Sequence, residues 1–227
     1  MSDTPPANTL RAAILVVTGF QQNCTLLWDD ATKDAAIIDP GGEVDRILDA
    51  IAKLDLAPSR IWLTHGHIDH AGGAAALAEA LRIANPDKPI PIEGPDKRDD
   101  FLLQALDEQG ARMGIPEARP VVPDRYLAEG DTLALGPHRF AVLHCPGHTP
   151  GHVVFVNHAA RFAIVGDVLF QGSVGRTDFP YGDPDALIAA IRDKLLPLGD
   201  DVGFLCGHGP ASTIGAERKL NPFLEGM

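Results

Sequence analysis

The stretch Thr64-His65-Gly66-His67-Ile68-Asp69-His70 places three histidines and an aspartate within six residues. It follows a short apolar run at 61–64, expected to be a strand, and precedes an Ala/Leu-rich segment at 71–83, expected to be a helix. Imidazole and carboxylate groups suit zinc and related first-row metals. Side chains two apart at a strand end, His65 and His67, can converge on one ion, and Asp69 and His70 can reach a second. The pattern predicts a metal site.

Further candidate ligands stand at the ends of other predicted strands. His148 lies in the loop 144–152, Asp167 follows the apolar run 162–166, and His208 lies in the loop 206–210. Because each residue stands where the backbone leaves a sheet, we expect them on the same edge as the first cluster. The candidate metal ligands are therefore His65, His67, Asp69, His70, His148, Asp167 and His208. The other histidines, interpreted as polar residues without a role in the site, are His138, His144, His152 and His158.

The apolar pattern of the whole chain predicts two similar halves. Strands are expected at 14–18, 24–28, 35–38 and 61–64, with a helix at 44–54. Strands are expected again at 133–135, 140–143, 153–156, 162–165 and 204–205, with a helix at 185–196. Strands that follow each other through short turns must be antiparallel. This order predicts a mixed α/β (α+β) fold, an αββα sandwich with two sheets inside and helices outside.

The chain is expected to form a single domain over 1–227. Residues 86–124 are rich in proline and charged residues and contain a predicted helix at about 99–109. This stretch is too short to bury a core of its own, so we interpret it as a loop-and-helix insertion near the site.

Composition limits the possible partners and location. The formal net charge of −12 argues against a nucleic-acid partner. No apolar run reaches about 18–20 residues, and residues 1–8 lack the features of a secretory signal, so no membrane contact is expected. Cys24, Cys145 and Cys206 have no paired spacing and are expected to be small buried residues in a reducing compartment, the cytoplasm. No oligomeric state follows from the sequence.

The motif 64–70, with His148, Asp167 and His208 downstream, resembles the metallo-β-lactamase-fold superfamily over nearly the whole chain. Within it, two segments resemble the short, single-domain hydroxyacylglutathione hydrolases, or glyoxalase II enzymes. They are Gly172-Ser173-Val174-Gly175-Arg176-Thr177-Asp178-Phe179-Pro180 and Cys145-Pro146-Gly147-His148-Thr149-Pro150-Gly151-His152. The run 212–223 fits the same subgroup.

The resemblance implies an enzyme with two divalent metal ions, expected to be zinc, with iron or manganese as alternatives. The first ion would take His65, His67 and His148, the second Asp69, His70 and His208, and Asp167 would bridge them. A hydroxide shared by the ions would attack the thioester of S-D-lactoylglutathione, giving D-lactate and glutathione. Asp69 would also act in catalysis by orienting that hydroxide.

The chain departs from the longer glyoxalase II enzymes around the substrate. Those enzymes carry a C-terminal helical domain that grips glutathione, whereas this chain ends nineteen residues after His208. Arg176 stands at the position of their substrate-binding cation, and Asp178 stands where they have an aromatic residue. We expect Arg176 to hold a substrate carboxylate. The alternative is a structural ion pair of Arg176 with Asp178 or Asp183.

Two other functions remain open. A glutathione persulfide dioxygenase would bind a single iron through His65, His148 and Asp167. A non-catalytic metal-binding domain would hold its metal with no open coordination position. A β-lactamase is disfavoured by the glyoxalase-like segments.

Overall fold

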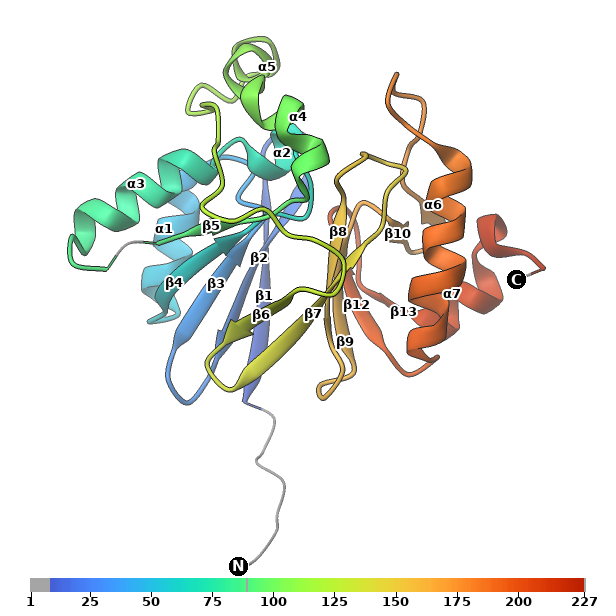
Figure 1. Ribbon diagram of the computed structural model, residues 1–227. Coiled ribbons are helices and arrows are strands. Elements are labelled where there is room, and N and C mark those ends of the chain that lie inside the picture. Colours follow the sequence, from blue (N-terminus) through green and yellow to red (C-terminus); the bar gives the residue numbers. More distant parts are fainter. Residues whose placement is uncertain (1–8, 89, 227) are drawn as a thin grey trace, which may run out of the picture.

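The computed structural model describes residues 9–88 and 90–226, so the expectation for residues 1–8 lies outside the described part. Two large β-sheets pack against each other, and helices cover both outer faces (Figure 1). The predicted αββα sandwich is confirmed.

The first sheet has the strand order β1-β2-β3-β4-β5. Its strands are β1 (Leu10–Val17), β2 (Gln22–Asp29), β3 (Asp34–Ile38), β4 (Ala57–Trp62) and β5 (Ile92–Glu93). The first three strands pair antiparallel, as expected for strands joined by short turns. Helix α1 (Val44–Lys53) connects β3 to β4, and these two strands are parallel.

The second large sheet has the order β13-β12-β9-β8-β7-β6. Its strands are β6 (Thr132–Leu135), β7 (His138–His144), β8 (Val153–Asn157), β9 (Phe162–Gly166), β12 (Gly203–Cys206) and β13 (Ser212–Thr213). A short hairpin of β10 (Leu169–Phe170) and β11 (Ser173–Val174) follows β9. Neighbours are antiparallel except β9 and β12, which are joined through helix α6 (Pro184–Ala190), the π-helix η2 (Ile191–Leu195) and the 3₁₀ helix η3 (Leu196–Leu198).

Three apolar layers hold the sandwich together. Between the sheets, Trp62 of β4 packs against Phe140 and Phe155 of the second sheet, with ring centroids 5.3 and 5.5 Å apart. Alternate residues of the first sheet face outward to α1 and to α3 (Ala74–Ala84). On the other side, α6 and α7 (Ile214–Leu220) cover β8, β9 and β12. Burial of both faces explains why the strands read as continuous apolar runs.

The stretch 86–124 differs in detail from its prediction. It contributes β5 to the first sheet, and the predicted helix at 99–109 is in fact two helices, α4 (Asp100–Gln104) and α5 (Leu106–Met113), with η1 (Lys97–Asp99) before them. Leu103, Leu106 and Ile115 join the same apolar layer as α1 and α3. Both helices lie above one end of the first sheet (Figure 1).

Several short elements were not predicted from the sequence. The predicted helix at 71–83 is preceded by a separate turn of helix, α2 (Ile68–Ala71), and the predicted helix at 185–196 changes from α to π geometry after Ala190. The last helical segment of the described residues is η4 (Pro222–Leu224). Over the described ranges, none of the helices has the length and apolar character needed to cross a bilayer.

Candidate metal centre

All seven candidate ligands lie at the same end of the sandwich. His65 follows β4, and His67 stands immediately before the short helix α2, which carries Asp69 and His70. His148 lies in the loop between β7 and β8. Asp167 directly follows β9, and His208 follows β12. The expectation that these strand ends share one edge is confirmed by the distances below.

Three imidazoles form the first cluster. Nδ1 of His67 lies 3.1 Å from Nε2 of His65 and 2.9 Å from Nε2 of His148. Their ring nitrogens all lie within 4.8 Å of one another. The three residues that the resemblance assigned to one ion are therefore brought together.

The opposite nitrogen of each ring has its own partner. Nδ1 of His148 lies 2.8 Å from the carbonyl oxygen of Arg176, which can only accept a hydrogen bond. Nδ1 of His65 lies 3.0 Å from Oγ1 of Thr64. Nε2 of His67 lies 2.9 Å from the hydroxyl of Tyr181. With protons at these outer positions, three nitrogen lone pairs face one another, and a cation between them would relieve their repulsion.

The second cluster contains Asp69, His70 and His208, whose ligand atoms also lie within 4.8 Å of one another. Oδ2 of Asp69 lies 3.2 Å from Nε2 of His208 and 3.8 Å from Nε2 of His70. Nδ1 of His70 lies 3.0 Å from Oδ2 of Asp39 and donates to it. In the neutral ring, this hydrogen bond places the proton on Nδ1, so that Nε2 of His70 can bind a metal ion at the cluster.

Asp167 lies between the two clusters. Its Oδ1 is 3.4 Å from Nε2 of His70, and its Oδ2 is 3.5 Å from Nε2 of His148 and 3.6 Å from Nε2 of His208. Oδ1 of Asp167 and Nε2 of His70 are both buried without a hydrogen-bond partner. Two buried acceptors that face each other are costly unless a cation lies between them. The donor set thus fits divalent metal ions.

Burial keeps the first cluster neutral. It lowers the pKa of His65 well below the usual range and that of His67 to about 3. Neutral imidazole is the form that binds metals. In the second cluster, burial disfavours a charged His70, but the carboxylates of Asp167 and Asp69 outweigh it and raise its pKa. The same negative charge that would hold a proton there can hold a metal ion.

Two glycines allow the site to close. A Cβ atom on Gly207 would overlap Oδ1 of Asp167 and lie 2.5 Å from Cε1 of His70. A Cβ atom on Gly41 would overlap the carbonyl oxygen of Asp69. Only glycine lets these two backbone segments approach the ligands so closely.

Two buried aspartates that the sequence did not single out hold the ligand loops. Asp39 follows β3 and accepts hydrogen bonds from the amide and hydroxyl of Thr64, at 2.7 and 2.6 Å. Asp39, His65 and His70 also form a third group of possible metal ligands. Their facing atoms, however, already share hydrogen bonds with one another and with Thr64. We therefore assign Asp39 to orienting ligands; its place at the same sheet edge as the others was the signal in the sequence.

Asp99 joins the two loops of the first cluster. Its carboxylate accepts from the amide of Gly66 at 2.9 Å, the hydroxyl of Thr149 at 2.7 Å and the amide of Gly151 at 2.5 Å. Burial raises the pKa of Asp99 to about 6 against the effect of these hydrogen bonds. No local pattern marked this residue, because its partners come from two distant loops.

The interpretation of His152 as a residue away from the site was wrong. His152 is fully buried, and its ring stacks on His65 with centroids 4.7 Å apart. Its Nε2 accepts a hydrogen bond of 3.0 Å from the amide of Asp167. The loop that brings His148 into the site carries His152 inward as well. His138 lies away from the site, with its Nε2 3.0 Å from Oδ2 of Asp29. The side chain of His144 forms a hydrogen bond with the carbonyl oxygen of Pro150.

An open cavity of 820 Å³ leads to both clusters. Arg176, Phe179 and Tyr181 line it beside the first cluster, where Phe179 lies 4.9 Å from the ring of His67. Arg176 forms a two-point ion pair with Asp178, at 2.9 and 3.0 Å, and covers the ring of Phe179. The alternative of an ion pair with Asp178 is therefore realised, yet Arg176 still borders the cavity. Tyr181 supplies an aromatic ring at the site even though position 178 is an aspartate.

The three cysteines are free and buried, as expected, and none belongs to either cluster. The thiol of Cys206 donates a hydrogen bond to the carbonyl of His208 at 3.0 Å.

The chain is similar to known proteins over nearly its whole length. The sequence model described as "Metallo-beta-lactamase superfamily" matches residues 17–208. Hydroxyacylglutathione hydrolase GloC of Haemophilus influenzae is 50% identical over 212 residues, which cover 93% of this chain and 96% of that protein. The probable metallo-hydrolase YqgX of Bacillus subtilis is 38% identical over 210 residues, which cover 92% of this chain and 94% of that protein.

Solved structures share the architecture. BLEG-1, a B3 metallo-β-lactamase, superposes with a TM-score of 0.83 and 35% identity, over 95% of this chain and 100% of that one. TTHA1623 in a di-iron-bound form gives a TM-score of 0.81 and 37% identity, over 93% of this chain and 100% of that one.

Proposed function

The chain belongs to the metallo-β-lactamase superfamily and is a metal-dependent hydrolase, and we propose that it cleaves the thioester of S-D-lactoylglutathione. The observation that carries the proposal is the 50% identity to the H. influenzae hydroxyacylglutathione hydrolase, which extends over 93% of this chain. An intact set of His and Asp clusters at the base of an open cavity supports it.

We propose that the site binds two divalent ions. His65, His67 and His148 would hold the first, Asp69, His70 and His208 the second, and Asp167 would contact both. The separation into two His/Asp clusters supports this division. The di-iron form of TTHA1623, 37% identical to this chain, supports a pair of ions and supports iron as an alternative to zinc.

Bound divalent ions would lower the pKa of water and polarise a carbonyl group. Asp69 would orient the attacking water by accepting its hydrogen bond at Oδ2, on the cavity side of the second cluster. The oxygen of water adds to the thioester carbon, and the C–S bond then breaks. One water is consumed, D-lactate and glutathione form, and one proton is released. Because a thiolate is a good leaving group, no separate acid is required.

Arg176 would bind a carboxylate of the glutathione portion. It is the only lysine or arginine among the described residues that line the cavity. Its guanidinium can add a substrate carboxylate to its contact with Asp178, since it carries five N–H donors. Buried free thiols also support the proposal that the enzyme works in the reducing cytoplasm.

Elemental analysis and thioester hydrolysis on one preparation test this function. We expect two equivalents of zinc or iron and loss of the thioester absorbance of S-D-lactoylglutathione. One iron with oxygen uptake on glutathione persulfide would instead identify a dioxygenase. Metal without turnover of any thioester, persulfide or chromogenic β-lactam would identify a non-catalytic domain.

His67→Ala supplies the site-directed control. It should abolish hydrolysis without unfolding the chain, because His67 stands at the cavity and is not itself part of the apolar layers. Exposed His158→Ala is the matched variant that should retain full activity. Full activity of a chelated, metal-free preparation would refute the proposed mechanism.

A further inference from the structure

The cavity has two chemically different sides. Arg176, Phe179 and Tyr181 lie beside the first cluster, as described above. Phe170 and Pro210 line the cavity beside His208, Phe20 and Met113 also line it, and so do the polar side chains of Gln109, Gln171 and Ser173. The ring of Phe170 lies 6.3 Å from that of His208, which fixes this apolar wall next to the second cluster.

The apolar wall is exposed although its side chains are large. Phe20 is 42% exposed and Met113 is 50% exposed, and both border the cavity. They come from different parts of the chain, the β1–β2 turn and the end of α5. Clustered apolar side chains at a cavity usually mark a surface that a ligand covers.

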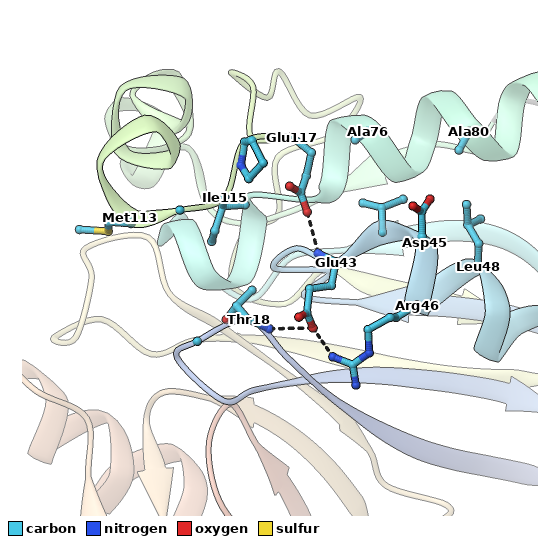
Figure 2. A pocket seen from close by; sticks show the side chains of 14 residues that line it. Thr18, Glu43, Asp45, Arg46, Leu48, Ala76, Ala80, Met113, Ile115 and Glu117 are labelled. Atoms are coloured by element: carbon cyan, nitrogen blue, oxygen red, sulfur yellow. Dashed lines mark hydrogen bonds and ion pairs between the residues drawn. The ribbon is translucent and has the colours of Figure 1, made fainter.

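Hydrogen bonds hold the two parts of this wall together. The Glu43 carboxylate accepts from the amide of Thr18 at 3.1 Å, in the turn that carries Phe20. The Glu43 amide donates to Oε1 of Glu117 at 2.6 Å, in the loop that follows Met113. Figure 2 shows Glu43 between Thr18 and Glu117, with Met113 on the adjoining helix. These hydrogen bonds connect the turn that carries Phe20 with the loop that follows Met113.

A lactoyl group is a poor match for this wall. It has three carbons and a hydroxyl group, so it covers little apolar surface in a cavity of 820 Å³. With the glutathione carboxylate at Arg176 and the scissile carbonyl over the clusters, the acyl chain would extend toward His208 and Phe170. An unbranched apolar acyl chain could then cover Phe20, Met113 and Phe170.

We propose that Phe20, Met113 and Phe170 form an acyl subsite, and that the preferred substrates are glutathione thioesters of apolar acyl groups longer than lactoyl. This inference rests on the proposed thioesterase function. The gain should approach fourfold per added methylene, which corresponds to about 0.8 kcal/mol for each buried CH₂ group.

The test compares kcat/KM for S-acetyl-, S-D-lactoyl-, S-butyryl- and S-hexanoylglutathione on one metal-loaded preparation. We expect the hexanoyl thioester, which has four more methylenes than the acetyl thioester, to exceed it by at least about tenfold and by up to about 250-fold. Phe20→Ala and Met113→Ala should each reduce that ratio about fivefold. Both side chains are exposed, so neither change should unfold the chain. Ile83→Ala, which removes an exposed apolar side chain from α3, should leave the ratio unchanged.

Binding gives a readout that does not depend on turnover. By calorimetry, the non-hydrolysable thioether S-hexylglutathione should bind at least tenfold more tightly than S-methylglutathione, and Met113→Ala should remove most of that difference. Equal rates and affinities along the series, with lactoyl thioester still hydrolysed, would overturn the acyl subsite alone. A steep series that neither variant alters would overturn the assignment to these residues. No hydrolysis of any glutathione thioester would refute the proposed function as well.

Discussion

Oδ2 of Asp39 lies 3.0 Å from Nδ1 of His70, and the same oxygen also accepts a hydrogen bond of 2.6 Å from the hydroxyl of Thr64. One buried carboxylate thereby fixes the ring of His70 and the residue that precedes His65. It connects the end of β3 with both proposed metal positions. A partner of this kind sets the tautomer of a metal-binding histidine and raises its basicity.

Asp39→Ala should weaken metal binding without removing a ligand. We expect a 10- to 100-fold loss of affinity, as is typical when a partner behind a ligating histidine is lost. Competition with a chromogenic chelator measures it. Asp49→Ala, an exposed carboxylate on α1, is the control and should bind metal normally. Unchanged affinity in Asp39→Ala would show that the hydrogen bond does not govern the site.

Gly207→Ala should abolish binding at the second cluster. The added methyl group would overlap Oδ1 of Asp167 and displace His70, so the ligand atoms could not converge. Metal content per chain, measured beside circular dichroism, should fall while the fold persists. Gly203 begins β12, the strand that Gly207 directly follows, and a Cβ at Gly203 would meet nothing nearer than the carbonyl oxygen of Ser212 at 4.0 Å. Gly203→Ala should keep its metal, and equal metal content in both variants would contradict the prediction.

Arg176→Ala should raise KM for glutathione thioesters about 10- to 100-fold and leave kcat nearly unchanged. The reason is that a charged hydrogen bond to a remote carboxylate contributes equally to ground state and transition state. Steady-state kinetics with S-D-lactoylglutathione measure the change. Arg192 makes a similar two-point ion pair with Asp193, at 2.7 and 2.8 Å, but does not line the cavity. Arg192→Ala should therefore have normal KM, and an equal effect of both changes would exclude a substrate contact.

The carboxylate of Asp29 lies far from the candidate metal ligands. It should make the free energy of unfolding depend on pH in the acid range. Asp29 ends β2, about 23 Å along the strand from Gln22, given about 3.3 Å per residue, and the side chain of Gln22 lies 3.5 Å from Nδ1 of His70. The hydrogen bond from Thr9 is the largest cause of a lowered pKa of the Asp29 carboxyl, and together with the hydrogen bonds from Thr32 and His138 it outweighs burial, which acts in the opposite direction. A lowered folded-state pKa stabilises the protein fully above the unfolded-state pKa, and the stabilisation is lost as the pH falls toward the folded-state value.

Asp29→Asn should accordingly reduce the free energy of unfolding at pH 7 by about 1–3 kcal/mol. The difference from the unaltered chain should shrink below about pH 4, where the carboxylate begins to protonate in the unfolded state. Urea unfolding at several pH values measures both effects. Asp49→Asn should show no such difference, and a constant deficit for Asp29→Asn at every pH would disprove the linkage.

The sequence by itself determined the layered fold and the convergence of the candidate ligands. The apolar runs of β2, β3, β8 and β9 are local features that require a buried sheet. Turns such as Asp39-Pro40-Gly41-Gly42 and the spacing of 64–70 are equally local. Since every candidate ligand follows a predicted strand, sheet geometry alone places them at one edge. Helix boundaries were less predictable, because the breaks at Ala105 and after Ala190 depend on packing.

Tertiary structure decided which residues support those ligands. Asp99 contacts Gly66 and Gly151, which stand 33 and 52 residues away in the chain. The hydroxyl of Tyr181 contacts His67, which is 114 residues away in the sequence. His152 is buried because the loop that carries His148 turns inward. Such partners carry no local signal, because the sequence around an aspartate or a tyrosine on a loop does not show whether its side chain faces water or a metal ligand. Only the folded chain removes the water and leaves each buried polar atom to find its partner within the protein.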